Sequence, residues 1–341
     1  MTTSGIELSL SPGTNLPAVS VVLPVLNEEL HLANAVNSIL SQDYSGDLEV
    51  ILALGPSKDK TDEIAQHLAS SDSRILLVRN PSGRTAAGLN AAINKSMNPV
   101  IVRVDAHSEL QKNYISLAIE VMKSSGAVNV GGIMGAEGKS PFERTVAAAM
   151  RSPLGVGASR FHTGGEPGYV DTVYLGVFIR SAVIAVGGFD ERFIRAQDWE
   201  LNYRLRQVGG KIFFDPRLHV TYRPRSSVRS LAKQYFEYGR WRRVVSRRHQ
   251  GTINYRYLAP PFALAGTTIS IVLALFFNPF FIFPALIYGI FLILASVITG
   301  KAISEKLLLP IVLFTMQMSW GLGFLTSPKT LAPAKGSESR G

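Results

Sequence analysis

The sequence predicts an α/β fold in which a mostly parallel wound sheet carries helices on both faces, followed by C-terminal transmembrane helices. Strand-like and helix-like segments alternate from Val19 to Val104, a pattern typical of parallel strands joined by right-handed crossovers. From Tyr257 to Gly300 the chain has no Asp, Glu, Lys or Arg, whereas the preceding residues mix charged and apolar side chains. The two parts are therefore expected to face different solvents.

The spacing of apolar residues predicts each element in order. The first strands are expected at Val19–Pro24, Glu49–Leu54, Arg74–Arg79 and Val100–Val104, and the helices between them at Glu29–Ser41, Thr61–Ala69 and Thr85–Lys95. Later segments predict strands Val170–Leu175 and Phe178–Arg180, helix Ser181–Val186, a turn at Gly187–Asp190, helix Asp198–Gln207 and a return to the sheet at Lys211–Phe214.

The apolar C-terminal part predicts about three transmembrane helices. Its runs are Leu258–Phe277, Phe280–Thr299 and Leu307–Leu325, and about 20 residues at 1.5 Å each cross a hydrocarbon core of roughly 30 Å. With the preceding Arg-rich stretch inside, three spans place the weakly basic tail outside, in mild conflict with the positive-inside rule. A helix break at Pro260-Pro261 would change the count and remove the conflict.

The charge distribution favours a membrane surface over nucleic acid as a partner. The net charge is +10, but the excess lies between Arg217 and Arg256, where Glu237 is the only acidic residue. This stretch directly precedes the apolar runs, where attraction to anionic headgroups predicts basic residues. Cys is absent, which excludes disulfides, thiolate metal sites and cysteine nucleophiles. The polar start of the chain lacks the pattern of a secretory signal, so the first domain is expected in the cytoplasm.

Polar residues at predicted strand ends are candidates for a ligand site. Asn27 and Glu28 follow the first strand and Asp105 ends the fourth, and strand ends of a wound sheet open onto one crevice. Asp105 and His107, one residue apart, offer a carboxylate and an imidazole to Mn²⁺ or Mg²⁺. The alternative is that Asp105 caps the next segment and His107 is a solvated loop residue.

Two further groups carry candidate chemistry. Asp198 and Glu200 begin a predicted helix, where the macrodipole favours anions, and Asp198 is either a general base or an N-cap. Arg240 and Trp241 precede the apolar runs. They suit either a diphosphate clamp with a sugar-stacking ring or an interfacial helix with snorkelling Arg.

The order of these motifs resembles the family 2 inverting glycosyltransferases of the GT-A fold. The resemblance covers Val19 to Trp241 and rests on Val21-Val-Leu-Pro24, Asn27-Glu28-Glu29, the Asp105 triplet, Gly187-Gly-Phe-Asp190, Gln197-Asp-Trp-Glu200 and Arg240-Trp241. The following helices, with Ser319-Trp-Gly-Leu-Gly-Phe324, look like the succinoglycan-assembly, ExoA-type membrane-anchored subgroup.

The resemblance implies a UDP-sugar or similar donor lying across the strand ends. A divalent ion at Asp105, with His107 where relatives usually have a second Asp, would neutralise the diphosphate, and Asp198 would deprotonate the acceptor hydroxyl. Donor contacts would come from the residues that match the family's binding segments, namely Pro24, Asn27, Glu28, Asp59, Arg84, Asn90, Arg240 and Trp241. Leu54 stands where relatives place an aspartate on uracil, which weakens the case for uridine.

The composition and the resemblance together imply an organisation and an activity. The expected parts are a disordered start (1–17), a GT-A nucleotide-sugar-binding catalytic domain (18–225), a basic interfacial segment (226–256), transmembrane helices (257–326) and a polar tail (327–341). Gln234 and Arg240 are separated by five residues instead of the two of processive relatives, which favours transfer of a single hexose. The expected acceptor is a polyprenyl-diphosphate-linked saccharide for surface polysaccharide at the inner membrane. The alternatives are polyprenyl phosphate as acceptor, or a non-catalytic membrane protein that binds nucleotide sugar or glycan.

Overall fold

The computed structural model describes residues 16–157 and 159–332. The predicted disordered start at 1–17 and the polar tail at 327–341 lie largely outside these residues. Contacts divide the chain into two compact units. The sheet unit contains the residues up to Gly135 together with Gly164–Thr221, and the helical unit contains Ala136–Thr163 together with the residues from Tyr222 onward.

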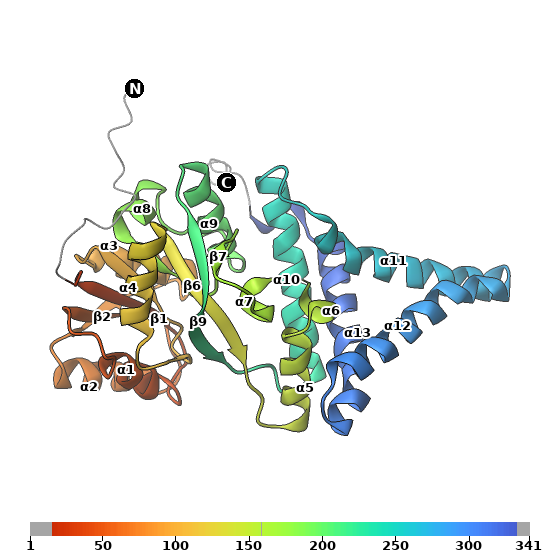
Figure 1. Cartoon of the computed structure of the whole chain (residues 1–341), viewed down its shortest axis with the longest axis horizontal. Coiled ribbons are helices and arrows are strands. Elements are labelled where there is room, and N and C mark those ends of the chain that lie inside the picture. The colour runs from red at the N-terminus through yellow and green to blue at the C-terminus, as the bar shows by residue number, and fades with distance from the viewer. Residues whose placement is uncertain (1–15, 158, 333–341) are drawn as a thin grey trace. The chain divides into compact units, whose positions relative to one another are not determined.

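The first half of the sheet unit is a wound parallel sheet. Strands β1 (Val19–Val25), β2 (Leu48–Leu54), β3 (Ile75–Arg79) and β4 (Val100–Arg103) pair in the order β3-β2-β1-β4. The chain moves outward from β1 to β3 and then returns to β4, so right-handed crossovers place α1 (Leu32–Leu40) and α2 (Thr61–Ser71) on one face and α3 (Thr85–Lys95) on the other (Figure 1). The topological switch point lies between β1 and β4, where wound sheets bind ligands.

The second half of the sheet is antiparallel. β8 (Val177–Ile179) pairs with both β4 and β6 (Asn129–Ala136), and β9 (Ile212–Tyr222) pairs with the two-residue strands β5 (Glu109–Leu110) and β7 (Gly168–Tyr169). Helices α4 (Tyr114–Ser125), α8 (Arg180–Ala185) and α9 (Gln197–Gln207) belong to this half. The predicted α/β sheet is therefore confirmed, and β4 is the strand at which parallel pairing gives way to antiparallel pairing.

The strand predicted at Val170–Leu175 is wrong. These residues form bends and irregular backbone, and Leu175 has a positive φ of 52°, which interrupts an extended conformation. Val173 and Leu175 are buried, so the alternating apolar pattern reflects a loop that packs its side chains into the core. The first helix also begins at Leu32 and not at Glu29, because residues 28–31 form a turn closed by the His31 N–H on the Glu28 carbonyl.

The helical unit contains the C-terminal apolar helices. α5 (Pro141–Met150), α6 (Pro153–Val156) and α7 (Arg160–Thr163) join α10 (Val228–Arg248), α11 (Tyr255–Phe276), α12 (Phe283–Thr299) and α13 (Ile303–Thr326). Three segments, Tyr255–Phe276, Pro279–Thr299 and Ile303–Thr326, are long and apolar enough to cross a membrane. Helix α11 continues through Pro260 and Pro261, so the helix is not broken there.

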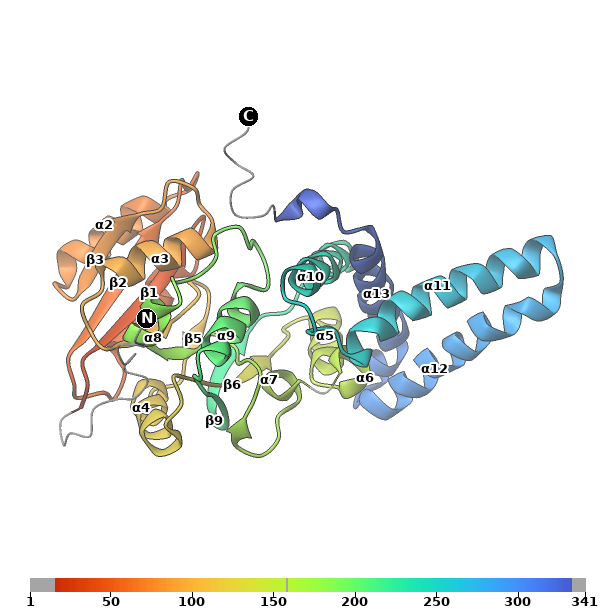
Figure 2. The same cartoon turned by 90° about the horizontal axis from the view of Figure 1, so that it is seen from above.

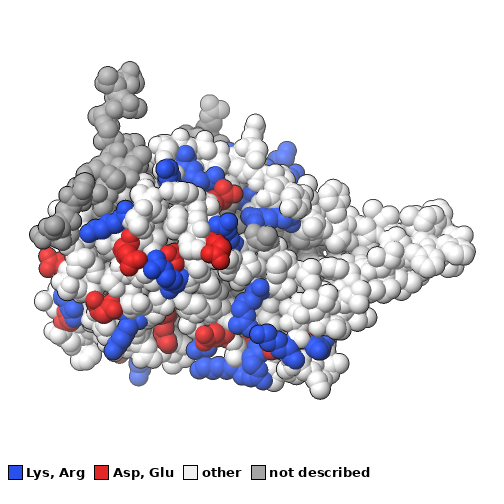
Figure 3. Space-filling view, in the orientation of Figure 1, with Lys and Arg blue, Asp and Glu red and all other residues white. Residues whose placement is uncertain are grey.

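The charged side chains avoid the far end of the α11–α12 hairpin. In Figure 3 the projecting end of the hairpin shows none of the coloured Lys, Arg, Asp or Glu side chains, which are spread over the rest of the visible surface. The three apolar helices and this distribution indicate an association of the protein with a membrane.

Candidate functional site

The loops after β1 and β4 meet at the switch point of the sheet. The Glu28 Oε1 lies 2.9 Å from the His107 Nδ1, so residues 79 positions apart contact one another. The side-chain oxygen of Asn27 accepts the Lys58 N–H at 2.8 Å, and the Glu28 N–H donates to the Thr61 Oγ1 at 2.7 Å. The β1 loop is thereby fixed between the β4 loop and the start of α2.

Arg103, the last residue of β4, joins the two predicted catalytic carboxylates. Its Nη2 donates to the Asp105 Oδ1 at 3.1 Å, and its Nη1 forms an ion pair with the Asp198 Oδ1. The Arg103 side chain is only 5% exposed, whereas those of Asp105 and Asp198 are 21% and 26% exposed. The buried Arg103 guanidinium therefore holds both carboxylates, which remain partly exposed to solvent.

Burial and charge act in opposite directions in this cluster. Burial raises the pKa of the Asp198 carboxyl, Arg103 opposes that shift, and the neighbouring Asp105 adds to it. For Arg103, burial would lower the pKa, but the two carboxylates overcome it and the pKa is raised. Arg103 therefore stays charged, and Asp198 is a stronger base than an exposed aspartate.

Backbone strain surrounds the cluster. Within the described chain the only non-glycine residues with positive φ are Asn27, Leu175 and Ala196, at 54°, 52° and 60°. Asn27 follows β1, and Ala196 immediately precedes α9, two residues before Asp198. Leu175 precedes Gly176, whose carbonyl accepts the Arg103 N–H at 3.2 Å. Such conformations cost about 1–3 kcal/mol each and persist mainly where a site requires them.

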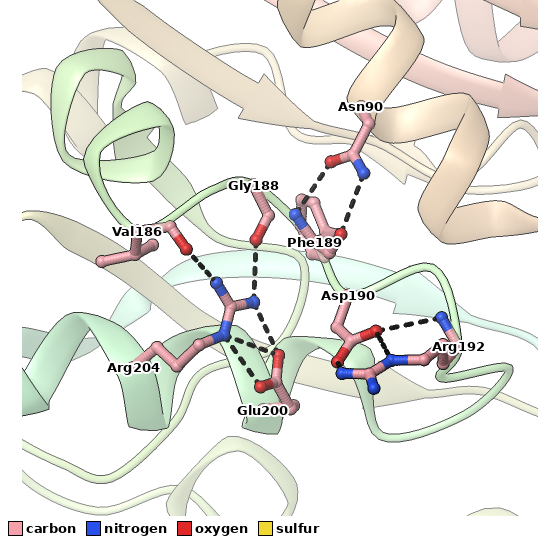
Figure 4. Close-up of polar contacts among 8 residues, drawn as sticks. All are labelled: Asn90, Val186, Gly188, Phe189, Asp190, Arg192, Glu200 and Arg204. Atoms are coloured by element: carbon pink, nitrogen blue, oxygen red, sulfur yellow. Dashed lines mark hydrogen bonds and ion pairs between the residues drawn. The ribbon is translucent and has the colours of Figure 1, made fainter. Parts of the chain in front are cut away.

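The segment before α9 is fixed by Arg204 (Figure 4). This guanidinium donates to the carbonyls of Val186 and Gly188 at 2.6 and 2.7 Å and forms a forked pair with Glu200. The Asp190 carboxylate in the same segment holds Arg192 in a similar fork. Arg204 therefore anchors the Gly187-Gly-Phe-Asp190 motif to α9.

Asn90 fixes the same segment from α3. Its side-chain oxygen accepts the Phe189 N–H at 2.8 Å, and its amide nitrogen donates to the Phe189 carbonyl and to Glu191, both at 2.9 Å. Figure 4 shows the two bonds to the backbone N–H and carbonyl of Phe189. Asn90 therefore has a clear structural role, and contact with a donor stays a prediction.

The remaining predicted residues occupy two regions. Pro24 lies in β1 beside α3, Arg84 is exposed at the start of α3, and Asp59 holds the α2 start through Thr61. The Thr61 hydroxyl is the main cause of the lowered pKa of Asp59. Arg240 and Trp241 lie in the helical unit, where Arg240 pairs with Glu237 at 2.9 Å and Trp241 is buried.

The residues at the end of β4 fit a divalent cation that takes some of its ligands from phosphate and water. In the described chain no group of three or more His, Asp and Glu side chains has the arrangement of a metal cage. Asp105 and His107 supply two ligands of suitable chemistry, and Mg²⁺ or Mn²⁺ commonly takes the rest from phosphate and water. Glu28, which contacts the Nδ1 of His107, would fix the orientation of the imidazole ring, as carboxylates behind metal-binding histidines do.

Sequence reasoning missed the two arginines that organise this region. Arg103 stands within the apolar run Val100-Ile-Val-Arg-Val104, and a charge in a buried strand requires a partner. The position of Arg103 within this apolar run was the signal that it has a buried acidic partner. Arg204 follows Glu200 by four residues on one helix, a spacing that predicts an ion pair, but nothing in the sequence indicates its bonds to Val186 and Gly188.

The chain is similar to known transferases. The model of the glycosyl transferase family 2 matches residues 20–187. The succinoglycan biosynthesis protein ExoA of Rhizobium meliloti (strain 1021) is 30% identical over 89% of this chain and 93% of its own length. A Methanococcus voltae dolichyl N-acetyl-alpha-D-glucosaminyl phosphate 3-beta-D-2,3-diacetamido-2,3-dideoxy-beta-D-glucuronosyltransferase is 25% identical over 71% of this chain and 77% of its own.

A solved structure shares the fold. The mannosyltransferase PcManGT from Pyrobaculum calidifontis, in complex with GDP-Man and Mn²⁺, superposes with a TM-score of 0.59. The match covers 92% of this chain and 88% of that one at 17% identity. The predicted GT-A fold is thereby confirmed.

Proposed function

Because this chain belongs to glycosyl transferase family 2, we propose that it transfers a single hexose, with inversion, from a nucleotide-diphosphate sugar to a polyprenyl-diphosphate-linked saccharide. A UDP-sugar is the first donor to test. The observation that carries the proposal is the convergence of Asp105 and Asp198 on Arg103 at the switch point of the sheet. One carboxylate is available to a cation and the other to a hydroxyl.

Asp198 acts as the general base. An alcohol is a poor nucleophile until a positioned group removes its proton as the new bond forms, and burial raises the pKa of Asp198 and so its basicity. Arg103 and the first turn of α9 hold the carboxylate in place. A single base that serves one displacement gives inversion at the anomeric carbon.

Asp105 and His107 would hold a Mn²⁺ or Mg²⁺ ion. When bound, such an ion supplies Lewis-acid stabilisation of the charge on the leaving diphosphate. Pro24, Asn27 and Glu28 border the donor from β1. Donor contacts by Asp59, Arg84, Asn90, Arg240 and Trp241 stay predictions, and the burial of Trp241 favours packing as its main role.

The apolar helices support a lipid-borne acceptor at the cytoplasmic side of the inner membrane. Membrane attachment confines the enzyme and a lipid-linked acceptor to one surface, which raises their effective concentration. The name of the M. voltae relative describes transfer to a sugar already carried on dolichyl phosphate, and that of ExoA describes succinoglycan biosynthesis. The first name favours a lipid-linked saccharide over bare polyprenyl phosphate as the acceptor, and the second favours a role in polysaccharide assembly.

The test is a donor screen with full-length protein in lipid nanodiscs. UDP- and GDP-hexoses are offered with Mn²⁺, Mg²⁺ or chelator, and with either a lipid-linked saccharide extract or polyprenyl phosphate. We expect one hexose on the lipid-linked saccharide, with inverted anomeric configuration by NMR, only when metal is present. The Asp62→Asn variant, which removes an exposed carboxylate on α2, serves as the matched control for Asp198→Asn.

Each other outcome contradicts a stated part of the proposal. Product in the chelated sample removes the metal from the mechanism. Product on polyprenyl phosphate alone replaces the acceptor. Donor binding without transfer from any donor favours a non-catalytic binding protein.

A further inference from the structure

Helices α10 and α13 run side by side in the same direction. The Ser327 hydroxyl donates to the Arg240 carbonyl at 3.0 Å, and Arg247 donates to the Ser327 and Pro328 carbonyls at 2.9 and 3.2 Å. Later residues of α10 thus meet later residues of α13. The helices are neighbours along their length, and α5 also packs on α13. Figures 1 and 2 both show α10 and α13 adjacent.

Glycines let these two backbones approach closely. A Cβ at Gly239 would lie 2.0 Å from the Trp320 carbonyl oxygen, and one at Gly323 would lie 2.0 Å from the Phe236 carbonyl oxygen. A Cβ at Gly321 would meet the Pro260 carbonyl of α11 at 2.6 Å. The Ser319-Trp-Gly-Leu-Gly-Phe324 motif is therefore the point at which α10, α11 and α13 cross. Moving α13 away from α10 would break these close backbone contacts.

The helix to which α13 is joined is strongly basic. Basic residues recur along one face of α10 at helical spacing, namely Arg229, Lys233, Arg240, Arg243 and Arg247. The Arg243 guanidinium lies 5.1 Å from the centre of the Phe324 ring of α13. This face extends over most of a helix of 21 residues, and charges at that density are too costly to place in hydrocarbon.

The exposed apolar side chains of α13 form a single stripe. Leu307, Ile311, Phe314, Leu322 and Leu325 are 48–71% exposed and recur at intervals of three, four or eight residues, whereas the opposite face is buried. The α11–α12 hairpin differs, because its exposed apolar residues include adjacent positions such as Leu275 and Phe276 or Ile293 and Leu294. The rest of α13 is covered by α10, α11 and α5, so only its stripe can meet lipid, whereas most of the surface of the hairpin can do so.

The hairpin crosses the α10–α13 pair. In Figure 1 α10 and α13 run up the page while α11 and α12 run across it, and in Figure 2, after a quarter turn, α10 is seen end-on while α11 and α12 still run across. Phe314, in the stripe, lies 6.5 Å from the Tyr288 ring of α12. The stripe therefore lies on the side from which the hairpin projects.

We infer that α13 does not cross the membrane but lies in its surface, with the stripe in the outer part of an anionic leaflet and the basic face of α10 beside the headgroups. The occupant of the stripe is thus lipid. Only the α11–α12 hairpin enters the hydrocarbon core. The two ends of α13 then lie on the same side of the membrane as α10, which also removes the conflict between three spans and a basic tail.

The absence of native cysteine allows a direct test of sidedness. Single cysteines replace Lys123 in the sheet unit, Lys301 before α13 and Lys329 after it, in full-length protein in inverted and right-side-out membrane vesicles. A membrane-impermeant maleimide is expected to label all three from the same side. Labelling of Lys301→Cys and Lys329→Cys from opposite sides would overturn the inference.

A depth measurement tests the partner. A fluorophore is attached to Leu307→Cys, Phe314→Cys or Leu325→Cys in phosphatidylethanolamine–phosphatidylglycerol vesicles that carry a shallow or a deep quencher. The shallow quencher is expected to be the more effective at all three positions, and the deep one at the control Ile269→Cys in α11. Deep quenching at Phe314 alone would indicate a span. Quenching by neither, or a cross-link between two Phe314→Cys copies, would assign the stripe to protein. Either result rejects the proposal.

Discussion

Asp198 and Glu200 stand two residues apart in the first turn of α9, yet their environments differ completely. The Glu200 side chain is 2% exposed and is held by Arg204 of the same helix. Asp198 is 26% exposed, and its partner Arg103 comes from a strand 95 positions away. The helix start makes both anions favourable, but tertiary contacts make one a part of the scaffold and leave the other facing solvent.

The largest expected effect is on the activity of Asp198→Asn. Removing a general base costs roughly 10²–10⁴-fold in kcat, while Arg103 keeps its bond to Asp105. Transfer of radiolabelled hexose and the melting temperature are measured together. The comparison fails if the variant keeps full activity, or if it loses activity only because it no longer folds.

Glu200→Gln is expected to act on stability instead. Breaking a buried ion pair costs about 3 kcal/mol at the lower end of the measured range, because Arg204 then lies beside a neutral amide. Denaturant unfolding of the solubilised protein checks this value. Specific activity per folded molecule should change only a few-fold, and a loss of activity at unchanged stability would place Glu200 in the reaction.

The pH dependence of stability tests the buried environment of Asp198. Burial raises the pKa of Asp198 in the folded protein. Between its pKa in the unfolded chain and its higher pKa in the folded protein, the folded state binds more protons, so stability falls as pH rises. Relative to wild type, Asp198→Asn should therefore gain stability as pH increases through that window. Thermal unfolding at a series of pH values measures this difference, and a difference that shrinks with rising pH contradicts it.

The smallest expected effect concerns Ala196, which positions Asp198 with a φ of 60°. A left-handed conformation costs a non-glycine residue about 1–2 kcal/mol, and glycine gives back about 0.4–1 kcal/mol through the unfolded chain. Ala196→Gly should therefore stabilise the protein by up to about 1 kcal/mol. Ala87→Gly within α3 is the control and should destabilise by a similar amount. Equal destabilisation of both would show that Ala196 is unstrained.

The first half of the fold was predictable because each strand and helix has its own apolar period. Thr85–Lys95 has the predicted bounds, and the neighbouring elements differ by a few residues. In contrast, β6 contains Gly131, Gly132 and Gly135, which read as a poor strand. A Cβ at Gly132 would lie 1.8 Å from the Leu218 carbonyl oxygen, and one at Gly135 would lie 2.1 Å from the His219 ring. These two glycines are therefore required by the close approach of β9, which no local sequence pattern reveals.

The candidate site was predictable only in part for the same reason. Asp105 and Asp198 lie in recognisable sequence motifs at expected positions, and the topology of the wound sheet explains why they come together. Their common partner Arg103 depends on a contact between β4 and α9, and the anchoring of Phe189 by Asn90 on one between α3 and a loop. Residue types and spacing identify chemistry, but pairing across the fold requires coordinates.

The helical unit is assembled from two distant stretches of the chain, and this has a consequence for translation. α5 is made well before α13, the helix on which it packs. On the ribosome α5 therefore lacks one of its packing partners until the last helix has been synthesised. A nascent chain that stops before Ile303 leaves the α13-facing side of α5 uncovered, which makes truncated products substrates for chaperones and proteases.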